Sequence, residues 1–368
     1  MKTYLFPGQG SQYQGMGEGL FDAFPELTQK ADRILGYSIK DLCLVDVQQQ
    51  LNQTQFTQPA LYVVNALAYQ KKLQDTGDLP DFVAGHSLGE YNALQSAGAI
   101  SFEDGLKLVK KRGELMSKAP KGAMMAVLGA SEQDIKKILQ DNALTGIDVA
   151  NYNSPTQIII SGLEQDIHKA DLCFADAQIR AIPLNTSGAF HSRYMVDAQR
   201  EFEAYLKKFT FGTFQFPVMS NVHARPYAQQ EIVANLASQI SHSVRWTESI
   251  QYLLRSGVTE FEELGAGTVL TRLISAIKTQ SPPSAINPEA KTTDCVCDTK
   301  AQTPEQQSPS DKVKHWNNTY PIGTKVLVKS YDAPLITKSS AVLLFGHRAA
   351  IYLQGYNGYF ALDDIKPV

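Results

Sequence analysis

Residues Val83-Ala84-Gly85-His86-Ser87-Leu88-Gly89-Glu90 join an apolar strand ending to a helix rich in small residues, through the pattern Gly-x-Ser-x-Gly. This pattern is typical of a nucleophile elbow, a tight strand-to-helix turn that exposes one hydroxyl. The two glycines leave room for strained backbone and for close contact between strand and helix. The helix directs its free N–H groups toward the serine, where negative charge would develop. The stretch therefore predicts an α/β fold with Ser87 as a nucleophile.

The composition is that of a water-soluble protein with two or three domains. The chain has 368 residues, of which 43% are hydrophobic, and this is enough for a sizeable core. Its formal net charge is −3 and its Lys and Arg residues are scattered, which argues against nucleic acid as a partner. We find no signal peptide and no apolar run of transmembrane length. We expect a cytoplasmic protein with neither a nucleic-acid nor a membrane partner.

The four cysteines do not indicate a metal site. Cys43 and Cys173 have apolar neighbours in the sequence, so we expect them to be reduced packing residues. Cys295 and Cys297 form a C-x-C in a polar stretch, where a metal would need a second pair of ligands nearby. A disordered or oxidisable pair is therefore favoured over a bound metal.

The first part of the chain reads as an α/β domain with an insertion. A short apolar strand at Thr3–Phe6 ends in the Gly-rich loop Pro7–Gln12, which is either a simple turn or a loop that offers backbone N–H groups to a ligand. Helices and strands then alternate, which favours a mostly parallel sheet. We expect residues 1–121 and 188–278 to form this larger α/β part. Residues 122–187 interrupt it.

The insertion has its own order of elements. We expect it to begin with a strand and a capped helix that starts at Ser131, and to contain a turn at Asn153–Pro155. The expected elements are strands at 123–128, 147–150, 157–161 and 179–184, a helix after Ser131 and another at 164–177. The order β-α-β-β-α-β is that of a ferredoxin-like unit, which we assign to residues 122–187.

The composition changes again after Lys278. The following stretch is rich in Pro, Ser, Thr, Gln and Asp, so we expect a flexible linker at 279–318. Short strands separated by glycines then predict a small, all-β, barrel-like module at 319–368, with strands at 323–328, 340–345, 349–353 and 358–362. A module of about 50 residues has only a marginal core of its own, so we expect it either to dock on a partner or to pack as an inert extension.

A serine nucleophile needs a base, and one of seven histidines stands out. His191 lies where the insertion rejoins the large part, and such junctions favour clefts. Its position alone leaves a catalytic and a structural role equally open. The others lie in less suitable places: His86, His168, His223, His242, His315 and His347. No carboxylate stands out as a third member, and a backbone carbonyl could orient the imidazole instead.

Arg112 is a charged residue on an apolar helix face. The stretch Ser101–Lys118 has the period of an amphipathic helix. Its polar face carries Lys107, Lys110, Lys111, Glu114 and Lys118, and its apolar face carries Leu108, Val109, Leu115 and Met116. A guanidinium among the latter is costly unless it is paired. The partner is either a buried carboxylate of the protein, which is the commoner case, or the carboxylate of a ligand, for which the planar fork is suited.

Taken together, several motifs resemble one family. Residues 1 to about 278 resemble the malonyl-CoA:acyl carrier protein transacylases, and among them the free-standing acyltransferases that serve polyketide synthases in trans. The motifs follow the family order and are Phe6-Pro7-Gly8-Gln9-Gly10-Ser11-Gln12, Thr57-Gln58-Pro59-Ala60-Leu61, Gly85-His86-Ser87-Leu88-Gly89-Glu90-Tyr91, Arg112-Gly113-Glu114-Leu115-Met116, Asn153-Ser154-Pro155, Gly188-Ala189-Phe190-His191-Ser192 and Val244-Arg245-Trp246.

The resemblance implies roles for individual residues. Ser87 would be the acylated nucleophile and His191 its base. The backbone N–H groups of Gln9 and Leu88 would form the oxyanion hole. Arg112 would bind the free carboxylate of a malonyl group. The family fold is an α/β-hydrolase-like large domain with a ferredoxin-like small domain, which agrees with the order of elements above.

Three further positions match the family, and one departs from it. The resemblance implies that the backbone carbonyl of Gln239 orients the histidine and that Gln58 lines the pocket. Phe190 before His191 resembles the form associated with malonyl preference, since its ring fills the space that a branched methyl would need. Ser243 stands where a proline is common before Val244, so the local loop geometry is less certain.

The implied activity is acyl transfer by a ping-pong reaction. The enzyme, an [acyl-carrier-protein] S-malonyltransferase, would move malonyl from malonyl-CoA through Ser87 to the phosphopantetheine thiol of an acyl carrier protein, for polyketide or fatty acid synthesis. It would hold no bound cofactor. The alternative is an editing acyl hydrolase acting on acyl-carrier-protein thioesters, although such enzymes lack the equivalent of Arg112. A second alternative makes the C-terminal module the functional centre, a docking element that carries the acyltransferase.

Overall fold

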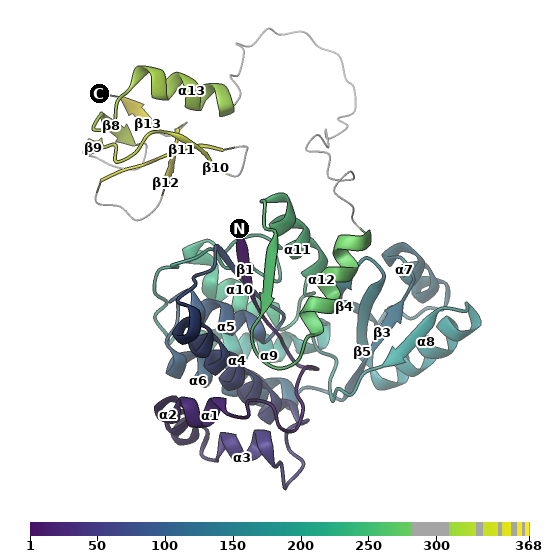
Figure 1. Cartoon of the computed structure of the whole chain (residues 1–368). Coiled ribbons are helices and arrows are strands. Elements are labelled where there is room, and N and C mark those ends of the chain that lie inside the picture. The colour runs from purple at the N-terminus through teal and green to yellow at the C-terminus, as the bar shows by residue number, and fades with distance from the viewer. Residues whose placement is uncertain (281–308, 329–333, 345–347, 355–358, 363–364, 368) are drawn as a thin grey trace, which may run out of the picture. The chain divides into compact units, whose positions relative to one another are not determined.

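The computed structural model describes residues 1–280, 309–328, 334–344, 348–354, 359–362 and 365–367 (Figure 1). The chain divides into two compact units, Met1–Pro288 and Glu289–Val368, which we describe separately. Cys295 and Cys297, and with them the question of a metal or an oxidisable pair, lie outside the described residues. In the described part of the chain, no helix is both long and apolar enough to cross a membrane.

The first unit contains a short parallel sheet. Its strands, in order across the sheet, are β2 (Phe82–Gly85), β1 (Lys2–Phe6) and β7 (Glu260–Glu263). Alternate residues of β1 enter different hydrophobic clusters, with Tyr4 and Phe6 on one face of the sheet and Leu5 on the other. Both faces are therefore buried, as the run of apolar residues in β1 predicts.

Helices cover the two faces of this sheet unequally. The larger cluster receives residues from α4 (Thr54–Thr76), α5 (Gly89–Ser96), α6 (Phe102–Ser117), α9 (Val196–Leu206) and α10 (Ile232–Gln239). The smaller cluster is covered by α11 (Trp246–Arg255) and α12 (Val269–Gln280). Outside the four-stranded sheet region described next, the other helices of this unit are α1 (Leu20–Ala23), α2 (Pro25–Leu35), α3 (Ile39–Leu44) and the 3-10 turns η1 (Arg193–Met195) and η2 (Gln229–Glu231). Figure 1 shows α5 beside β1, and α4 lies against both α5 and α6.

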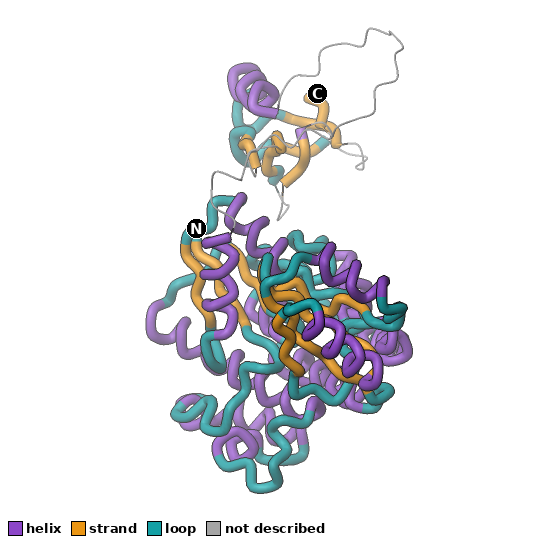
Figure 2. Tube along the Cα trace, turned by 90° about the vertical axis from the view of Figure 1, so that its right-hand side faces the viewer, coloured by secondary structure: helices purple, strands orange, loops and turns teal. Residues whose placement is uncertain are grey.

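A four-stranded antiparallel sheet forms the inserted part of the first unit. Its strands are ordered β4 (Asp148–Ser154), β5 (Gln157–Leu163), β3 (Gly122–Leu128) and β6 (Arg180–Pro183). With α7 (Glu132–Asp141) and α8 (Glu164–Asp176) they enclose a separate hydrophobic cluster. Figure 2 shows these strands, in orange, lying beside purple helices. The six elements occur in the expected order, but β4 continues to Ser154, so Asn153 lies in a strand and not in a turn.

The described residues of the second unit form one helix and six short strands. They are α13 (Pro309–Thr319), β8 (Lys325–Val328), β9 (Leu335–Ile336), β10 (Val342–Leu344), β11 (Arg348–Tyr352), β12 (Tyr359–Ala361) and β13 (Ile365–Pro367). The strands form two three-stranded sheets, β13-β8-β9 and β10-β11-β12, which a bridge between Thr337 and Leu353 connects. Trp316 of α13 joins Ile351 and other residues in a small core of this unit alone.

The expected boundaries of the linker need correction. Residues Thr279 and Gln280 belong to the end of α12, and residues 309–318 belong to α13. The polar composition favoured a linker here, whereas α13 is helical and buries Trp316 in the core of the second unit. The strands β9 and β13 were also not expected, because each is only two or three residues long.

Candidate active site

The turn between β2 and α5 holds Ser87 in a strained conformation. The φ angle of Ser87 is 50°, in the left-handed region that non-glycine residues seldom adopt. A Cβ atom at Gly89 would lie 2.0 Å from the carbonyl oxygen of Phe6, and one at Gly85 would lie 1.9 Å from the carbonyl carbon of Gly89. Only glycine at these two positions lets the strand and the helix approach closely enough to form the turn.

The hydroxyl of Ser87 contacts the imidazole of His191. Ser87 Oγ and His191 Nε2 are 2.8 Å apart. On its other side the ring approaches two backbone carbonyls, with Nδ1 at 2.8 Å from Gln239 O and 3.2 Å from His242 O. A carbonyl can only accept, so Nδ1 carries the proton and Nε2 is free to accept the proton of Ser87. The pair thus has the arrangement of a nucleophile and its general base, oriented without a carboxylate.

Burial keeps His191 neutral. Its side chain is almost entirely enclosed, and burial, with the charge of Arg112 as a second cause, lowers the pKa of His191 to about 3. A neutral imidazole is the form that can accept a proton, so the base is available throughout the neutral range.

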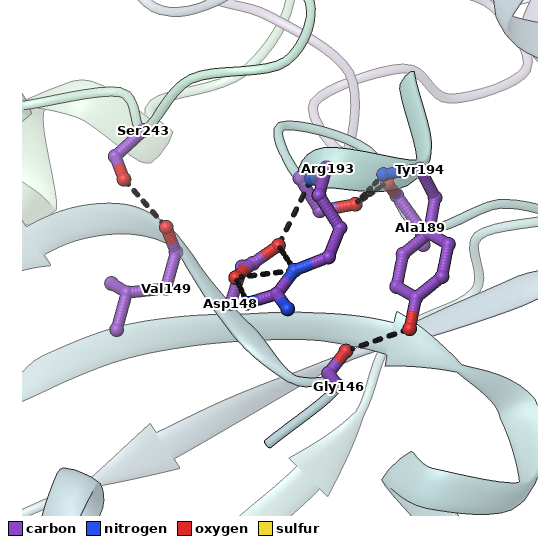
Figure 3. Close-up of polar contacts among 8 residues, drawn as sticks. Gly146, Asp148, Val149, Ala189, Arg193, Tyr194 and Ser243 are labelled. Atoms are coloured by element: carbon purple, nitrogen blue, oxygen red, sulfur yellow. Dashed lines mark hydrogen bonds and ion pairs between the residues drawn. The ribbon is translucent and has the colours of Figure 1, made fainter. Parts of the chain in front are cut away.

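The segment that carries His191 is anchored to the inserted sheet. Arg193 donates from its backbone N–H and its guanidinium to Asp148 at the start of β4, with an Nη2–Oδ1 distance of 2.5 Å (Figure 3). Tyr194 Oη donates to Gly146 O at 3.0 Å, and Ser243 Oγ donates to Val149 O at 2.5 Å. Ser243 thus makes a hydrogen bond that the proline common at this position could not make. These contacts hold the residues after His191, and the loop that contains Ser243, against β4 and the residue Gly146 shortly before it.

Arg112 has no carboxylate partner within ion-pair distance among the described residues. Its side chain is only 1% exposed. Its Nη1 donates to Gln58 Oε1 at 2.8 Å, and its Nη2 donates to Gln239 Oε1 at 2.9 Å and to Ser87 Oγ at 3.1 Å. Nε has no hydrogen-bond partner in the described part of the chain. The structural ion pair that the sequence favoured is therefore not formed, and a buried positive charge lies beside Ser87.

A cavity of about 240 Å³ opens onto these groups. Six of the eight predicted site residues line it: Gln9, Gln58, Ser87, Arg112, Phe190 and His191. Leu88 and Gln239 do not line the cavity. Leu88 directly follows Ser87 in the chain, and Gln239 bonds to Arg112 through its side chain and to His191 through its backbone carbonyl. The inserted sheet supplies the far wall with Met124, Asn151, Asn153 and Gln157 among others. The cavity therefore lies between the two sheets of the first unit.

Two backbone N–H groups near Ser87 have no acceptor among the described residues. Leu88 precedes the first helical residue of α5, and Gln9 lies in the loop after β1. Neither N–H donates to an acceptor in the described part of the chain. Gln9 is held by its side chain, whose Nε2 donates to Thr54 Oγ1 at 3.2 Å. Free donors at a helix N-terminus and an adjacent loop are what an oxyanion hole requires.

Comparison with known proteins places the chain in a family. Residues 3–295 match the acyl transferase domain family. A protein of Bacillus velezensis, the polyketide biosynthesis malonyl CoA-acyl carrier protein transacylase BaeC, is 57% identical over 286 residues, which are 77% of this chain and 99% of that protein. The chain belongs to the malonyl-CoA:acyl carrier protein transacylase family.

Solved structures of transacylases are similar to it as well. A malonyl CoA-acyl carrier protein transacylase from Burkholderia pseudomallei has a TM-score of 0.75 at 52% identity, covering 77% of this chain and 99% of the other. A malonyl-transacylase in complex with its type II polyketide synthase acyl carrier protein has a TM-score of 0.72 at 34% identity, over 76% and 93% of the two chains.

The sequence did not single out four polar residues at this transacylase site. His86 lines the cavity and bonds through Nε2 to Asn153 Oδ1 at 2.8 Å, not to Ser87. Asn221 Oδ1 accepts from the backbone N–H of Ser87 at 2.7 Å, and Glu90 is fully buried nearby. The acidic residue in an otherwise apolar helix start was the available signal for Glu90. Nothing in the loop around Asn221 distinguishes it from other loops.

Proposed function

We propose that this protein transfers a malonyl group from malonyl-CoA to the phosphopantetheine thiol of an acyl carrier protein, in trans for a polyketide synthase. The reaction passes through a malonyl ester of Ser87. The enzyme works without a bound cofactor, because the acyl donor and the carrier bring the reactive thioester and thiol. The relative named for polyketide biosynthesis at 57% identity supports the polyketide context.

The observation that carries this proposal is the guanidinium of Arg112 beside Ser87. It is buried, it is bonded to amides and a hydroxyl, and no carboxylate among the described residues forms an ion pair with it. A malonyl thioester has a free carboxylate at one end and the reactive carbonyl at the other. Binding the carboxylate at Arg112 compensates the buried charge and brings the carbonyl to Ser87 Oγ.

The first half-reaction acylates the serine. His191 Nε2 takes the proton of Ser87 as Oγ attacks the malonyl carbonyl. The N–H groups of Gln9 and Leu88 stabilise the oxyanion, and loss of one such donor would cost about 3 kcal/mol. The C–S bond then breaks, and CoA leaves as a thiol after it receives the proton from His191. Malonyl remains on Ser87 as an ester.

The second half-reaction returns the serine. The phosphopantetheine thiol of the carrier loses its proton to His191 and attacks the ester carbonyl. The C–O bond to Ser87 breaks, and Oγ receives the proton back. Each half-reaction begins with a neutral His191, which fits its enclosed position and low pKa.

Phe190 narrows the choice of acyl group. Its side chain is buried and lines the cavity. A phenyl ring at this place occupies the volume that the methyl branch of methylmalonyl would need, and a close-packed pocket tolerates extra volume poorly. We therefore infer malonyl rather than methylmalonyl as the preferred group.

The order of the elements also supports a proposed domain organisation. Residues 1–121 and 188–278 make an α/β-hydrolase-like large subdomain, and residues 122–187 make a ferredoxin-like small subdomain. The strand order β4-β5-β3-β6 with two helices supports the latter assignment. We infer that α13 and the short strands β8 to β13 together form a small barrel-like module after the linker. The enzyme is placed in the cytoplasm, where its carrier substrate is made.

Transfer and hydrolysis can be separated in one assay. The full chain is incubated with malonyl-CoA and a phosphopantetheinylated acyl carrier protein, and the masses of carrier and free malonate are followed. We expect malonyl to appear on the carrier at least ten times faster than as free malonate. Ser87→Ala should abolish both.

The alternative function, that of an editing acyl hydrolase, predicts the opposite result. It would release acetate from an acetyl-loaded carrier rapidly and leave no malonyl on the carrier. That outcome would contradict the proposal, and Arg112 would then have a structural role.

A further inference from the structure

Glu90 is a buried carboxylate whose place in the reaction is not yet explained. It follows Gly89 at the start of α5, and its side chain is 0% exposed. Its Oε1 accepts from the Tyr227 hydroxyl at 2.5 Å and from the backbone N–H of Asn221 at 3.1 Å. Its Oε2 accepts from Gln239 Nε2. A carboxylate with this many donors has a specific role in organising its surroundings.

Two of these donors also hold the backbone of the nucleophile. Asn221 Oδ1 accepts from Ser87 N at 2.7 Å, and Gln239 Nε2 donates to Ser87 O at 2.7 Å. The φ angle of Ser87 is 50°, and such a conformation persists only when its surroundings fix it. Glu90 therefore holds both groups that restrain the strained peptide units on either side of Ser87.

Glu90 also decides which way the Gln239 amide points. Its nitrogen faces two acceptors, Glu90 and Ser87 O, while its oxygen accepts from Arg112 Nη2 at 2.9 Å. The reversed amide would place NH₂ against the guanidinium and its oxygen against two acceptors. The carboxylate thus fixes the acceptor that positions Arg112, on the same residue whose carbonyl orients His191 at 2.8 Å.

The charges that face Glu90 come from several elements. Arg112 on α6 is the charged group whose field favours the ionised form, and the hydroxyl of Tyr227, before η2, donates to it. The guanidinium of Arg112 lies over the neighbouring Tyr91 ring, with Cζ 5.7 Å from the ring centroid. Burial is the larger effect and raises the pKa of Glu90 to about 7, while Tyr227, Gln239, Asn221 and Arg112 lower it. The group is therefore poised to change its charge near neutral pH.

We propose that ionised Glu90 is a positioning residue for acyl transfer, acting through Gln239 and Asn221 on Ser87, Arg112 and His191. This inference rests on the proposed transacylase function. Glu90 does not touch the substrate. When it is protonated, its oxygens accept more weakly from Gln239 and Asn221, and the restraint on the amide and on the serine backbone is weakened.

The first test is Glu90→Gln in the full chain. The amide supplies a donor where Gln239 needs an acceptor, so we expect kcat for malonyl transfer to fall at least ten-fold while KM changes less than about three-fold. Glu231→Gln is the matched control, because Glu231 is paired with Arg225 at the surface. It should keep the wild-type rate. A Glu90→Gln variant that folds and transfers malonyl at the wild-type rate would overturn the inference.

The second test is a pH profile with Tyr227→Phe, which stays informative if Glu90→Gln fails to fold. The wild-type kcat/KM should fall as the pH drops through about 7, because Glu90 becomes protonated there, whereas His191 would protonate only near 3. Tyr227 lowers the pKa of Glu90, so its removal should move this acidic limb to higher pH. At pH 8.5, where Glu90 is ionised in both proteins, the kcat/KM values of the wild type and Tyr227→Phe should agree within about three-fold.

The failures of this inference and of the proposed function look different. An unchanged acidic limb in Tyr227→Phe, with malonyl still transferred, would overturn the role of Glu90 alone. A wild-type enzyme that never forms a malonyl ester on Ser87 would overturn the proposed function itself.

Discussion

At the scale of single residues, the properties of the site depend on the burial of two basic side chains. Arg112 and His191 are both enclosed, and burial lowers the pKa of each. The guanidinium stays charged because its ordinary pKa is far above neutral, whereas the imidazole becomes neutral. In the proposed mechanism, one buried environment thus yields a fixed cation for the substrate and a free base for Ser87.

Replacing Arg112 should change selectivity more than turnover of neutral substrates. Arg112→Ala should lower kcat/KM for malonyl-CoA about 100-fold, the equivalent of roughly 3 kcal/mol for charge-assisted hydrogen bonds, and leave acetyl-CoA within about three-fold. Steady-state kinetics with both substrates measures this. Arg225→Ala, at an exposed ion pair, serves as the control. If malonyl preference survives in Arg112→Ala, the arginine has only a structural role.

The low pKa of His191 makes the folded state sensitive to acid. The unfolded chain binds a proton at the ordinary value of 6.5, and the folded chain does so only near 3. Stability from this residue is therefore complete above about 6.5 and is lost as the pH falls toward 3. Between pH 6.5 and 4.5 we expect the wild type to lose about 2–3 kcal/mol relative to His191→Gln. Urea unfolding at the two pH values measures the difference, and parallel curves would contradict it.

The residues that the sequence identified are those whose type conflicts with their surroundings or belongs to a motif. Ser87 lies between two glycines, and Arg112 lies on an apolar helix face, so both could be found in the chain itself. Asn221 could not, because its contact with Ser87 joins residues 134 positions apart. Likewise the absence of an ion pair at Arg112 depends on which side chains the fold brings near it.

At the scale of elements, the strand-to-helix turn organises the site. The turn sets Ser87 between β2 and α5, and it depends on two glycines that pack backbone against backbone. Because backbone atoms cannot move aside as a flexible side chain can, this contact should tolerate no substitution.

Gly89→Ala tests how rigid the turn is. Its Cβ would lie 2.0 Å from Phe6 O, so we expect a loss of more than about 3 kcal/mol or failure to fold. Gly77→Ala is the matched control, because Gly77 has a φ of 66° and open space around it, and should cost about 1 kcal/mol. Thermal unfolding compares the two variants. Equal effects would show that the contact at Gly89 is not rigid.

Element prediction succeeded where a period extends over several turns or strands. The amphipathic period of 101–118 corresponds to α6, and the expected order of strands and helices in 122–187 corresponds to β3 through β6. It failed where polarity was taken for irregular structure. The turn expected at Asn153 is the end of β4, paired with β5, and part of the expected linker is α13. Pairing to a distant strand and packing on a small core override local composition in both cases.

At the scale of the whole molecule, the two units have separate cores. The three hydrophobic clusters of the first unit contain no residue beyond Ile277, and the cluster of the second unit begins at Trp316, within the described residues. All groups assigned to catalysis lie in the first unit. The function of the second unit can therefore be tested by removing it.

A chain that ends at Gln280 should keep its chemistry. We expect malonyl loading of a free carrier protein within about two-fold of the full chain, because no proposed site residue or core cluster of the first unit is removed. If product assembly by the cognate synthase falls while loading is unchanged, the module recruits the enzyme. If neither changes, it is an inert extension. A large loss of free-carrier loading would contradict the separation of chemistry from the module.

The central claim is that Ser87 carries malonyl between CoA and a carrier protein. Intact mass measurement after incubation with malonyl-, methylmalonyl- and acetyl-CoA tests it most directly. The account predicts a stable malonyl adduct on the wild type, much weaker adducts with the other two, and none on Ser87→Ala. A lasting acetyl adduct with no malonyl adduct, or a malonyl adduct that persists in Ser87→Ala, would contradict it.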